Sequence, residues 1–221
     1  GFQEFFTQRQ KPLIRTSEKL EKHHFPSHLD LVVRQRRPLA SWSILILTEK
    51  RLEEPNSRVS NMSEIVTLMV GDKAPDFEAP LTDGSDFVLS EVLDSGKGVI
   101  LYFYPRDNTP GCTSQACDFR DNFSRISNNS WIVVGVSTDS AKSHEKFIDK
   151  HDLPFDLIVD EDAELHTMYG TWREKSMYGK TYMGTLRSTF AITQEGKLSW
   201  VGYKVKTKGH VDQLMTDLGI E

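Results

Sequence analysis

The sequence predicts an α/β sandwich, because strands alternate with helices through the middle of the chain and a hairpin then precedes a closing helix. Residues 99–104 and 131–137 are almost wholly apolar, which is typical of strands that are buried on both faces and usually parallel. Residues 189–193 and 198–203 flank the turn-forming segment 194–197, and this pattern predicts an antiparallel hairpin.

From residue 66 to residue 126 the pattern predicts six elements. They are a strand at 66–70, a turn at 71–75, a hairpin of 77–79 with 87–89, a single helical turn at 90–93, a buried strand at 99–104 and a helix at 113–126. The hairpin prediction depends on the turn residues 82–85. The helix prediction depends on apolar residues at helical spacing, which are Ala116, Phe119, Phe123 and Ile126.

The second half predicts four strands and three helices. The strands cover residues 131–137, 155–159, 189–193 and 198–203, and the helices cover residues 140–151, 162–169 and 209–218. Gly170 and Gly219 follow the last two helices, where glycine commonly ends a helix. Residues 172–182 are rich in aromatic and basic side chains and are predicted to form a loop.

Composition excludes several classes of protein. The net charge of -5 gives no general footprint for nucleic acid, and no apolar run approaches the roughly 18–20 residues needed to cross a bilayer. Two cysteines in 221 residues do not make a secreted disulfide scaffold, so a redox pair in a reducing compartment is the better interpretation. Neither a metal nor a bound cofactor is expected, since no histidine lies close to the two sulfurs in sequence.

Residues 1–61 differ from residues 62–221 in charge. They hold 11 basic and 7 acidic residues, whereas the remainder holds 16 basic and 25 acidic residues. We interpret residues 1–61 as a poorly structured extension upstream of a natural start at Met62, and residues 62–221 as the folded domain. The alternative is a targeting segment, but the seven acidic residues and the short apolar core after Arg37 argue against it.

Cys112 follows the transition from strand to loop to helix. Thr109 is predicted to be the N-cap and Pro110 the first helical residue, so Cys112 falls in the first turn. There the unpaired N–H groups and the positive end of the helix dipole favour the thiolate, which is the nucleophilic form of cysteine. We expect the Thr109 hydroxyl to donate to the sulfur or to a bound oxygen. The alternative is an inert, buried cysteine.

Cys117 lies five residues after Cys112. In an ideal α-helix this spacing separates the two Cα atoms by about 8.6 Å, whereas a disulfide tolerates at most about 7 Å. The two sulfurs therefore cannot bond while the helix is intact. A disulfide that forms and breaks with local unfolding fits this spacing better than a permanent cross-link.

The segment from Pro105 through Thr109 to Cys112 resembles the PxxxTxxC signature of peroxiredoxins. With Thr-Pro-Gly-Cys-Thr and the later Cys117, it is most similar to the bacterioferritin-comigratory-protein (PrxQ) branch. Further segments that agree cover residues 71–77, 135–140 and 183–190. The resemblance implies a thioredoxin-like fold, in which helices flank a central mixed sheet, with an N-terminal β-hairpin extension.

The resemblance also implies the site residues. Cys112 would attack a hydroperoxide and become a sulfenic acid, the first step of thiol oxidation. The Cys112 N–H, the Thr109 hydroxyl and the Arg187 guanidinium would donate to the reacting atoms. Pro105 would shield the sulfur and shape the loop. The alternative for Arg187, from the residues alone, is a surface arginine beside a hairpin.

Cys117 would be the resolving thiol that forms an intramolecular disulfide with Cys112. The family implies recycling by thioredoxin or a similar dithiol protein, a monomer, and a cytoplasmic location. The alternative function is a peroxide sensor that relays oxidation through the same thiols. A disulfide oxidoreductase is disfavoured because no Cys-x-x-Cys pair is present.

Other polar residues are given structural interpretations. His144, His151 and His166 are predicted to be surface or packing residues. Asp139 and Asp160 are predicted to be caps at strand ends. The loop 172–182 either borders the peroxide entrance or the surface for the reductant, or is a plain connection.

Overall fold

The computed structural model describes residues 65–177 and 179–221. The predicted extension, residues 1–61, and the domain boundary at Met62 lie outside the described residues, so that division of the chain stays a prediction. No helix in the described part is long and apolar enough to cross a membrane.

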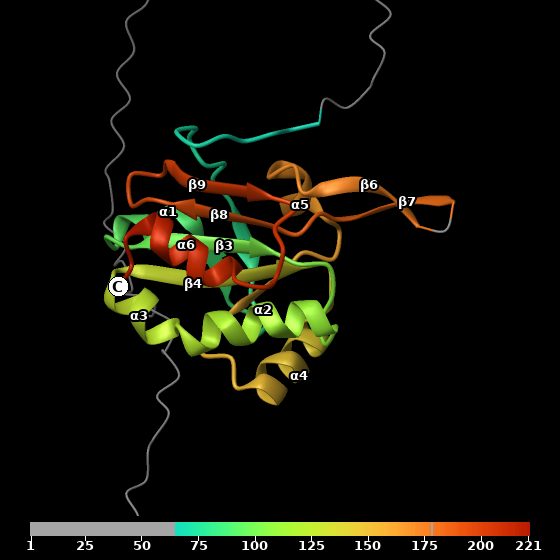
Figure 1. Cartoon of the computed structure of the whole chain (residues 1–221), viewed down its shortest axis with the longest axis horizontal. Coiled ribbons are helices and arrows are strands. Elements are labelled where there is room, and N and C mark those ends of the chain that lie inside the picture. Colours follow the sequence, from blue (N-terminus) through green and yellow to red (C-terminus); the bar gives the residue numbers. More distant parts are fainter. Residues whose placement is uncertain (1–64, 178) are drawn as a thin grey trace, which may run out of the picture. The chain divides into compact units, whose positions relative to one another are not determined.

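A five-stranded mixed sheet forms the centre of the fold (Figure 1). Its strands lie in the order β5 (Leu157–Val159), β4 (Trp131–Ser137), β3 (Gly98–Phe103), β8 (Ser188–Ile192) and β9 (Leu198–Tyr203). Strands β3, β4 and β5 run parallel, whereas β8 is antiparallel to both β3 and β9. Every residue of β3 is buried, as its apolar sequence predicts.

Helices and a hairpin cover the two faces of this sheet. Successive residues of β3 point to opposite faces, so Ile100 and Tyr102 belong to one apolar core and Leu101 and Phe103 to the other. The first core is completed by α2 (Pro110–Asp121), α3 (Phe123–Asn128), α4 (Ala141–His151) and α6 (His210–Leu218). The second is completed by α1 (Leu89–Asp94), α5 (Glu164–Met168) and the hairpin of β1 (Glu78–Pro80) and β2 (Asp86–Val88). The α/β, thioredoxin-like prediction and its N-terminal hairpin are therefore confirmed.

The predicted helix over residues 113–126 is divided into two helices in the structure, although Thr109 and Pro110 mark the helix start as predicted. Helix α2 begins at Pro110, and a separate helix α3 begins at Phe123. Asn122 separates them, with φ -100° and ψ 2°, and its side-chain amide donates to the Asp118 carbonyl at 2.9 Å. Apolar spacing alone misses this break, because Phe119, Phe123 and Ile126 still contribute to one core.

The predicted strand over residues 66–70 is also wrong, because this segment pairs with no described strand. Its backbone is held by side chains instead: the Leu68 N–H donates to Tyr203 Oη at 3.0 Å, and Arg173 Nη2 donates to the Val66 carbonyl at 2.8 Å. The apolar side chains of Met69 and Val70 remain exposed, so the apolar composition that predicted a strand here does not reflect pairing in the sheet.

The predicted loop over residues 172–182 is instead a two-stranded antiparallel sheet. Strands β6 (Trp172–Met177) and β7 (Lys180–Thr185) pair from Trp172 opposite Thr185 to Met177 opposite Lys180. Figure 1 shows this hairpin extending beyond the central sheet. Residues 180–183 are exposed, so no buried face imposes the apolar alternation by which a strand is recognised.

Phe190 lies in β8 and is fully buried between the rings of Phe103, Tyr169 and Tyr203. Replacing Phe190 with Ala should lower the free energy of unfolding by about 3–5 kcal/mol, because it leaves a cavity in a packed core. Urea denaturation measures this loss. Met183→Ala, at a half-exposed side chain, is the control and should change the free energy of unfolding by less than about 0.5 kcal/mol. Equal effects would contradict the assignment of the core.

Candidate active site

The active-site loop, residues 104–109, connects β3 to the first turn of α2. The Tyr104 N–H still pairs with the Val136 carbonyl, so the loop leaves the sheet immediately afterwards. Thr109 is extended, with φ -88° and ψ 148°, and its carbonyl accepts the Thr113 N–H at 2.8 Å. Pro110 therefore occupies the first helical position and Cys112 lies in the first turn, where a thiolate is favoured.

Arg187, 75 residues later in the chain, contacts the Cys112 sulfur. Its Nη2 lies 3.2 Å from Cys112 Sγ, and the sulfur-bearing residue is only 2% exposed. Arg187 lies in the short connection between β7 and β8. A guanidinium at this distance favours a negatively charged sulfur and can donate to a second acceptor as well.

Gln115 lies one helical turn after Cys112 and orients this arginine. Arg187 Nη1 donates to Gln115 Oε1 at 2.6 Å. Gln115 is fully buried, and its Nε2 has no hydrogen-bond partner among the described residues. The sequence interpretation missed Gln115, although its spacing of three residues from Cys112 places both on the same face of a helix.

Thr109 differs from its prediction in one respect. It occupies the N-cap position, but its hydroxyl makes no capping hydrogen bond. The hydroxyl donates instead to the Arg106 carbonyl at 3.0 Å, which closes the loop on itself. Pro105 is half-buried in the same loop.

Cys117 lies in the same helix as Cys112, and neither is in a disulfide. Helix α2 is continuous from Pro110 to Asp121, so both thiols are fixed on it five residues apart. Cys117 is half-buried, whereas Cys112 is buried. The structure therefore holds the two thiols in a state that cannot cross-link without local unfolding.

Lys175 is a second cation near the site, and it comes from the hairpin that the sequence interpretation missed. Its ammonium group donates to the Thr185 carbonyl, two residues before Arg187. Burial and then the Arg187 charge lower the pKa of Lys175, while Cys112 acts in the opposite direction. Predicting this residue from sequence required knowing that β6 pairs with β7.

His210 lies at the start of α6, within range of the Arg187 charge. Its Nε2 is 2.9 Å from Thr189 Oγ1, and its ring contacts Phe119 and Trp200. Burial, and then the Arg187 charge, lower the pKa of His210 to about 4. His210 is therefore neutral near pH 7 and adds no positive charge to the site.

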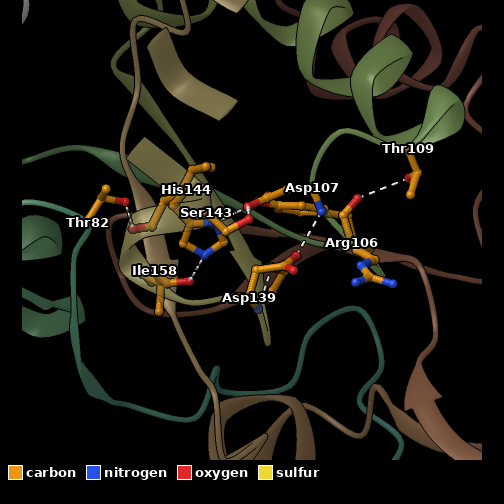
Figure 2. Close-up of polar contacts among 11 residues, drawn as sticks. Thr82, Arg106, Asp107, Thr109, Asp139, Ser143, His144 and Ile158 are labelled. Carbon is orange, nitrogen blue, oxygen red and sulfur yellow. Dashed lines mark hydrogen bonds and ion pairs between the residues drawn. The ribbon is translucent and has the colours of Figure 1, made fainter. Parts of the chain in front are cut away.

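Asp107 anchors the active-site loop to the sheet and to α4 (Figure 2). Its carboxylate accepts from Tyr104 Oη at 2.7 Å and from Ser143 Oγ at 2.7 Å, and lies 2.9 Å from His144 Nδ1. Its N–H donates to Asp139 Oδ2 at 2.8 Å. The loop that leads to Cys112 is thus held through both the backbone and the side chain of one residue.

These contacts add to two predictions. His144 is fully buried, as a packing residue is, and it is also paired with a carboxylate. Asp139 lies just after the end of β4, where it accepts the Ser137 hydroxyl and also the Asp107 N–H of the active-site loop. The tertiary contact between the loop and α4 creates both roles, and neither residue type alone indicates it.

The other predicted polar residues have structural roles. Asp160, at the end of β5, accepts the N–H groups of Leu165 and His166 at 3.1 and 2.9 Å, as a cap does. His166 is fully buried, and its Nδ1 lies 2.6 Å from Asp160 Oδ2. His151 is half-buried at the end of α4, against the ring of Phe147.

The arrangement defines a cysteine-dependent redox site on a thioredoxin-like fold. A helix N-terminus and a guanidinium both stabilise negative charge at the Cys112 sulfur, and the Arg187 fork can also donate to a bound oxygen. Among the described residues, no cluster of three or more His, Cys, Asp or Glu side chains could hold a metal ion.

Comparisons with known proteins identify the family. Residues 70–201 match the AhpC/TSA family. The chain is 44% identical over 153 residues to peroxiredoxin Bcp of Bacillus subtilis, which covers 69% of this chain and 96% of that protein. Among solved structures, a mutant of Xanthomonas campestris peroxiredoxin Q matches 65% of this chain and 90% of its own, with 36% identity and a TM-score of 0.62. A mutant of Xylella fastidiosa PrxQ matches 70% of this chain and 97% of its own, with 30% identity and a TM-score of 0.65.

The chain belongs to the AhpC/TSA family and, within it, to the Bcp/PrxQ peroxiredoxins, which are thiol-dependent peroxidases. The resemblance drawn from Pro105, Thr109 and Cys112 is thereby confirmed at the level of the family.

The lowered pKa of His210 predicts a pH-dependent stability. Between its pKa of about 4 in the folded protein and its ordinary 6.5, the unfolded chain binds more protons at this residue, so the free energy of unfolding rises with pH across that window. His210→Gln should remove roughly 2 kcal/mol of the gain between pH 5 and pH 7. Urea denaturation at both pH values measures it, and an unchanged gain in the variant would contradict the prediction.

Proposed function

We propose that this protein reduces hydrogen peroxide and organic hydroperoxides to water and alcohols through Cys112. The observation that carries this proposal is the 3.2 Å contact between Arg187 Nη2 and the Cys112 sulfur in the first turn of α2. A solved structure of the Xanthomonas campestris bacterioferritin comigratory protein is described in terms of its alkyl peroxide reduction activity, which supports organic hydroperoxides as substrates here.

In the first step the Cys112 thiolate attacks one oxygen of the O–O bond. The S–O bond forms while the O–O bond breaks, the leaving oxygen takes a proton to become water or an alcohol, and the sulfur is oxidised to a sulfenic acid. Negative charge spreads from the sulfur to both oxygens in the transition state. Arg187 stabilises that charge with donors already in place, which is the effect that contributes most to catalysis of this kind.

Thr109 and Pro105 have supporting roles in this proposal. The single hydroxyl proton of Thr109 is directed to the Arg106 carbonyl, so the lone pairs of Oγ1 remain to accept a hydrogen bond from the peroxide. The Thr109 oxygen therefore orients the substrate as an acceptor, in contrast to the donor role expected from the sequence. Pro105 brings no N–H group into the loop and shields the sulfur from water.

Cys117 completes the cycle. Its thiol attacks the Cys112 sulfenic acid, releases water and forms an intramolecular disulfide, after part of α2 has unwound. A dithiol protein such as thioredoxin then reduces that disulfide. We further propose that the enzyme acts as a monomer in the cytoplasm, where dithiol proteins are available to reduce the Cys112–Cys117 disulfide after each turnover.

Replacing Cys112 with Ser should abolish peroxide consumption, because a hydroxyl at this position is not ionised at neutral pH and is a poor nucleophile. The measurement is loss of hydrogen peroxide with thioredoxin, thioredoxin reductase and NADPH present. Unfolding curves of the variant should match those of the wild type, so that lost activity is not lost structure. Retained consumption would refute the nucleophile assignment.

Replacing Cys117 with Ser should leave the first oxidation unchanged and block recycling by thioredoxin. After one equivalent of peroxide, mass spectrometry of the wild type should find a Cys112–Cys117 disulfide, and the variant should instead accumulate a sulfenic acid that a dimedone probe traps. If thioredoxin recycles the Cys117→Ser variant at the wild-type rate, Cys117 is not the resolving residue.

A further inference from the structure

Both ring nitrogens of His144 face hydrogen-bond acceptors (Figure 2). Nδ1 lies 2.9 Å from Asp107 Oδ2, and Nε2 lies 3.2 Å from the main-chain carbonyl oxygen of Ile158. A carbonyl oxygen cannot donate, and neither can an ionised carboxylate. A neutral imidazole has a single N–H, so either tautomer would turn a lone pair towards an acceptor. Only the doubly protonated ring satisfies both contacts.

The groups around His144 are consistent with a doubly protonated, positively charged ring. Tyr104 Oη lies 3.4 Å from Nδ1 but 2.7 Å from Asp107 Oδ1, and the shorter contact takes its proton. Burial opposes the ionisation of Asp107, but the hydrogen bond and charge of His144, followed by Ser143 and Tyr104, outweigh it and lower the pKa of Asp107. Asp139, which accepts the Asp107 N–H, adds a further carboxylate next to Asp107.

A second buried histidine in the described part of the same domain, His166, lacks the two acceptor contacts that His144 makes. His166 Nδ1 lies 2.6 Å from Asp160 Oδ2, but its Nε2 is buried without a partner among the described residues. One N–H therefore suffices for His166. The two pairs also hold different elements, because Asp160 caps α5, whereas Asp107 belongs to the active-site loop.

We propose that His144, held as an imidazolium between Asp107 and the Ile158 carbonyl, is a positioning residue for the peroxidase reaction. It fixes Asp107, and with it the loop that ends in Thr109, the N-cap of the helix that carries Cys112. An imidazolium fully removed from water requires its partners to keep their places, since an uncompensated buried charge is costly. The sulfur and Arg187 are thereby kept in contact while the peroxide is attacked. This inference rests on the proposed function.

The first test is the rate constant for oxidation of Cys112 by a hydroperoxide in a single turnover, measured by stopped flow on reduced protein. His144→Gln and Asp107→Asn should each slow this step by about 10- to 100-fold, as a small misplacement of reacting groups does. The double variant removes both charges together. Its rate should be no lower than that of the slower single variant, because the two penalties share one interaction.

His166→Gln is the matched control, since it also removes a fully buried histidine paired with an aspartate. It should lower the thermal stability of the protein and leave the rate constant of the first oxidation within about twofold of wild type. If His144→Gln has no more effect on that rate than His166→Gln, or if the penalties of the single variants multiply in the double variant, the positioning role is refuted.

The second test needs no variant that must fold and no turnover. Long-range ¹H–¹⁵N spectra of the reduced wild type should show both His144 nitrogens protonated at pH 7, while His166 shows one protonated nitrogen. A neutral His144 would overturn the inference even if peroxidase activity is established. A wild type that consumes no peroxide would instead overturn the proposed function, while the spectrum would still test whether His144 is an imidazolium.

Discussion

The contact between Arg187 and Cys112 depends on the pairing of two strands. Strand β3 leads into the loop that precedes α2, the helix that carries Cys112, and β8 follows immediately after Arg187. These strands are antiparallel neighbours, with Phe103 opposite Ser188, so the end of one lies beside the beginning of the other. A shift of register by one residue would turn every side chain of β8 to the opposite face. Both faces of β8 are buried against packed cores, and that burial resists such a shift.

Local chemistry made part of the site predictable. A threonine, a proline and a glycine before Cys112 are sufficient to predict a helix start, and the structure begins α2 at Pro110. Arg187 could be placed only through the family resemblance, because 75 residues separate it from Cys112 in sequence. The apolar composition of residues 99–104 and the turn after residues 189–193 predict the two strands, but neither signal specifies which strands are neighbours.

The remaining site residues depend on contacts that leave no periodic trace in the sequence. Lys175 reaches the site from a hairpin in which residues 180–183 of β7 are exposed, so that strand lacks the alternation that signals a strand. His144 looks like an ordinary residue of an amphipathic helix until α4 is packed against the loop at Asp107. The direction of the Thr109 hydroxyl likewise follows from where the Arg106 carbonyl lies, which the loop conformation determines.

Asn122 divides what the apolar pattern presents as one long helix, and this division limits how far a disturbance of α2 can spread. Helical hydrogen bonds are cooperative, so melting that begins near Cys112 would otherwise extend along the whole segment. The backbone angles of Asn122 depart from helical values and weaken that cooperativity, and α3 starts from Asn122 as its own N-cap with Ile126 buried in the core. Helix α2 can then open as a small unit of its own, while the packing of α3 keeps the rest of the domain closed.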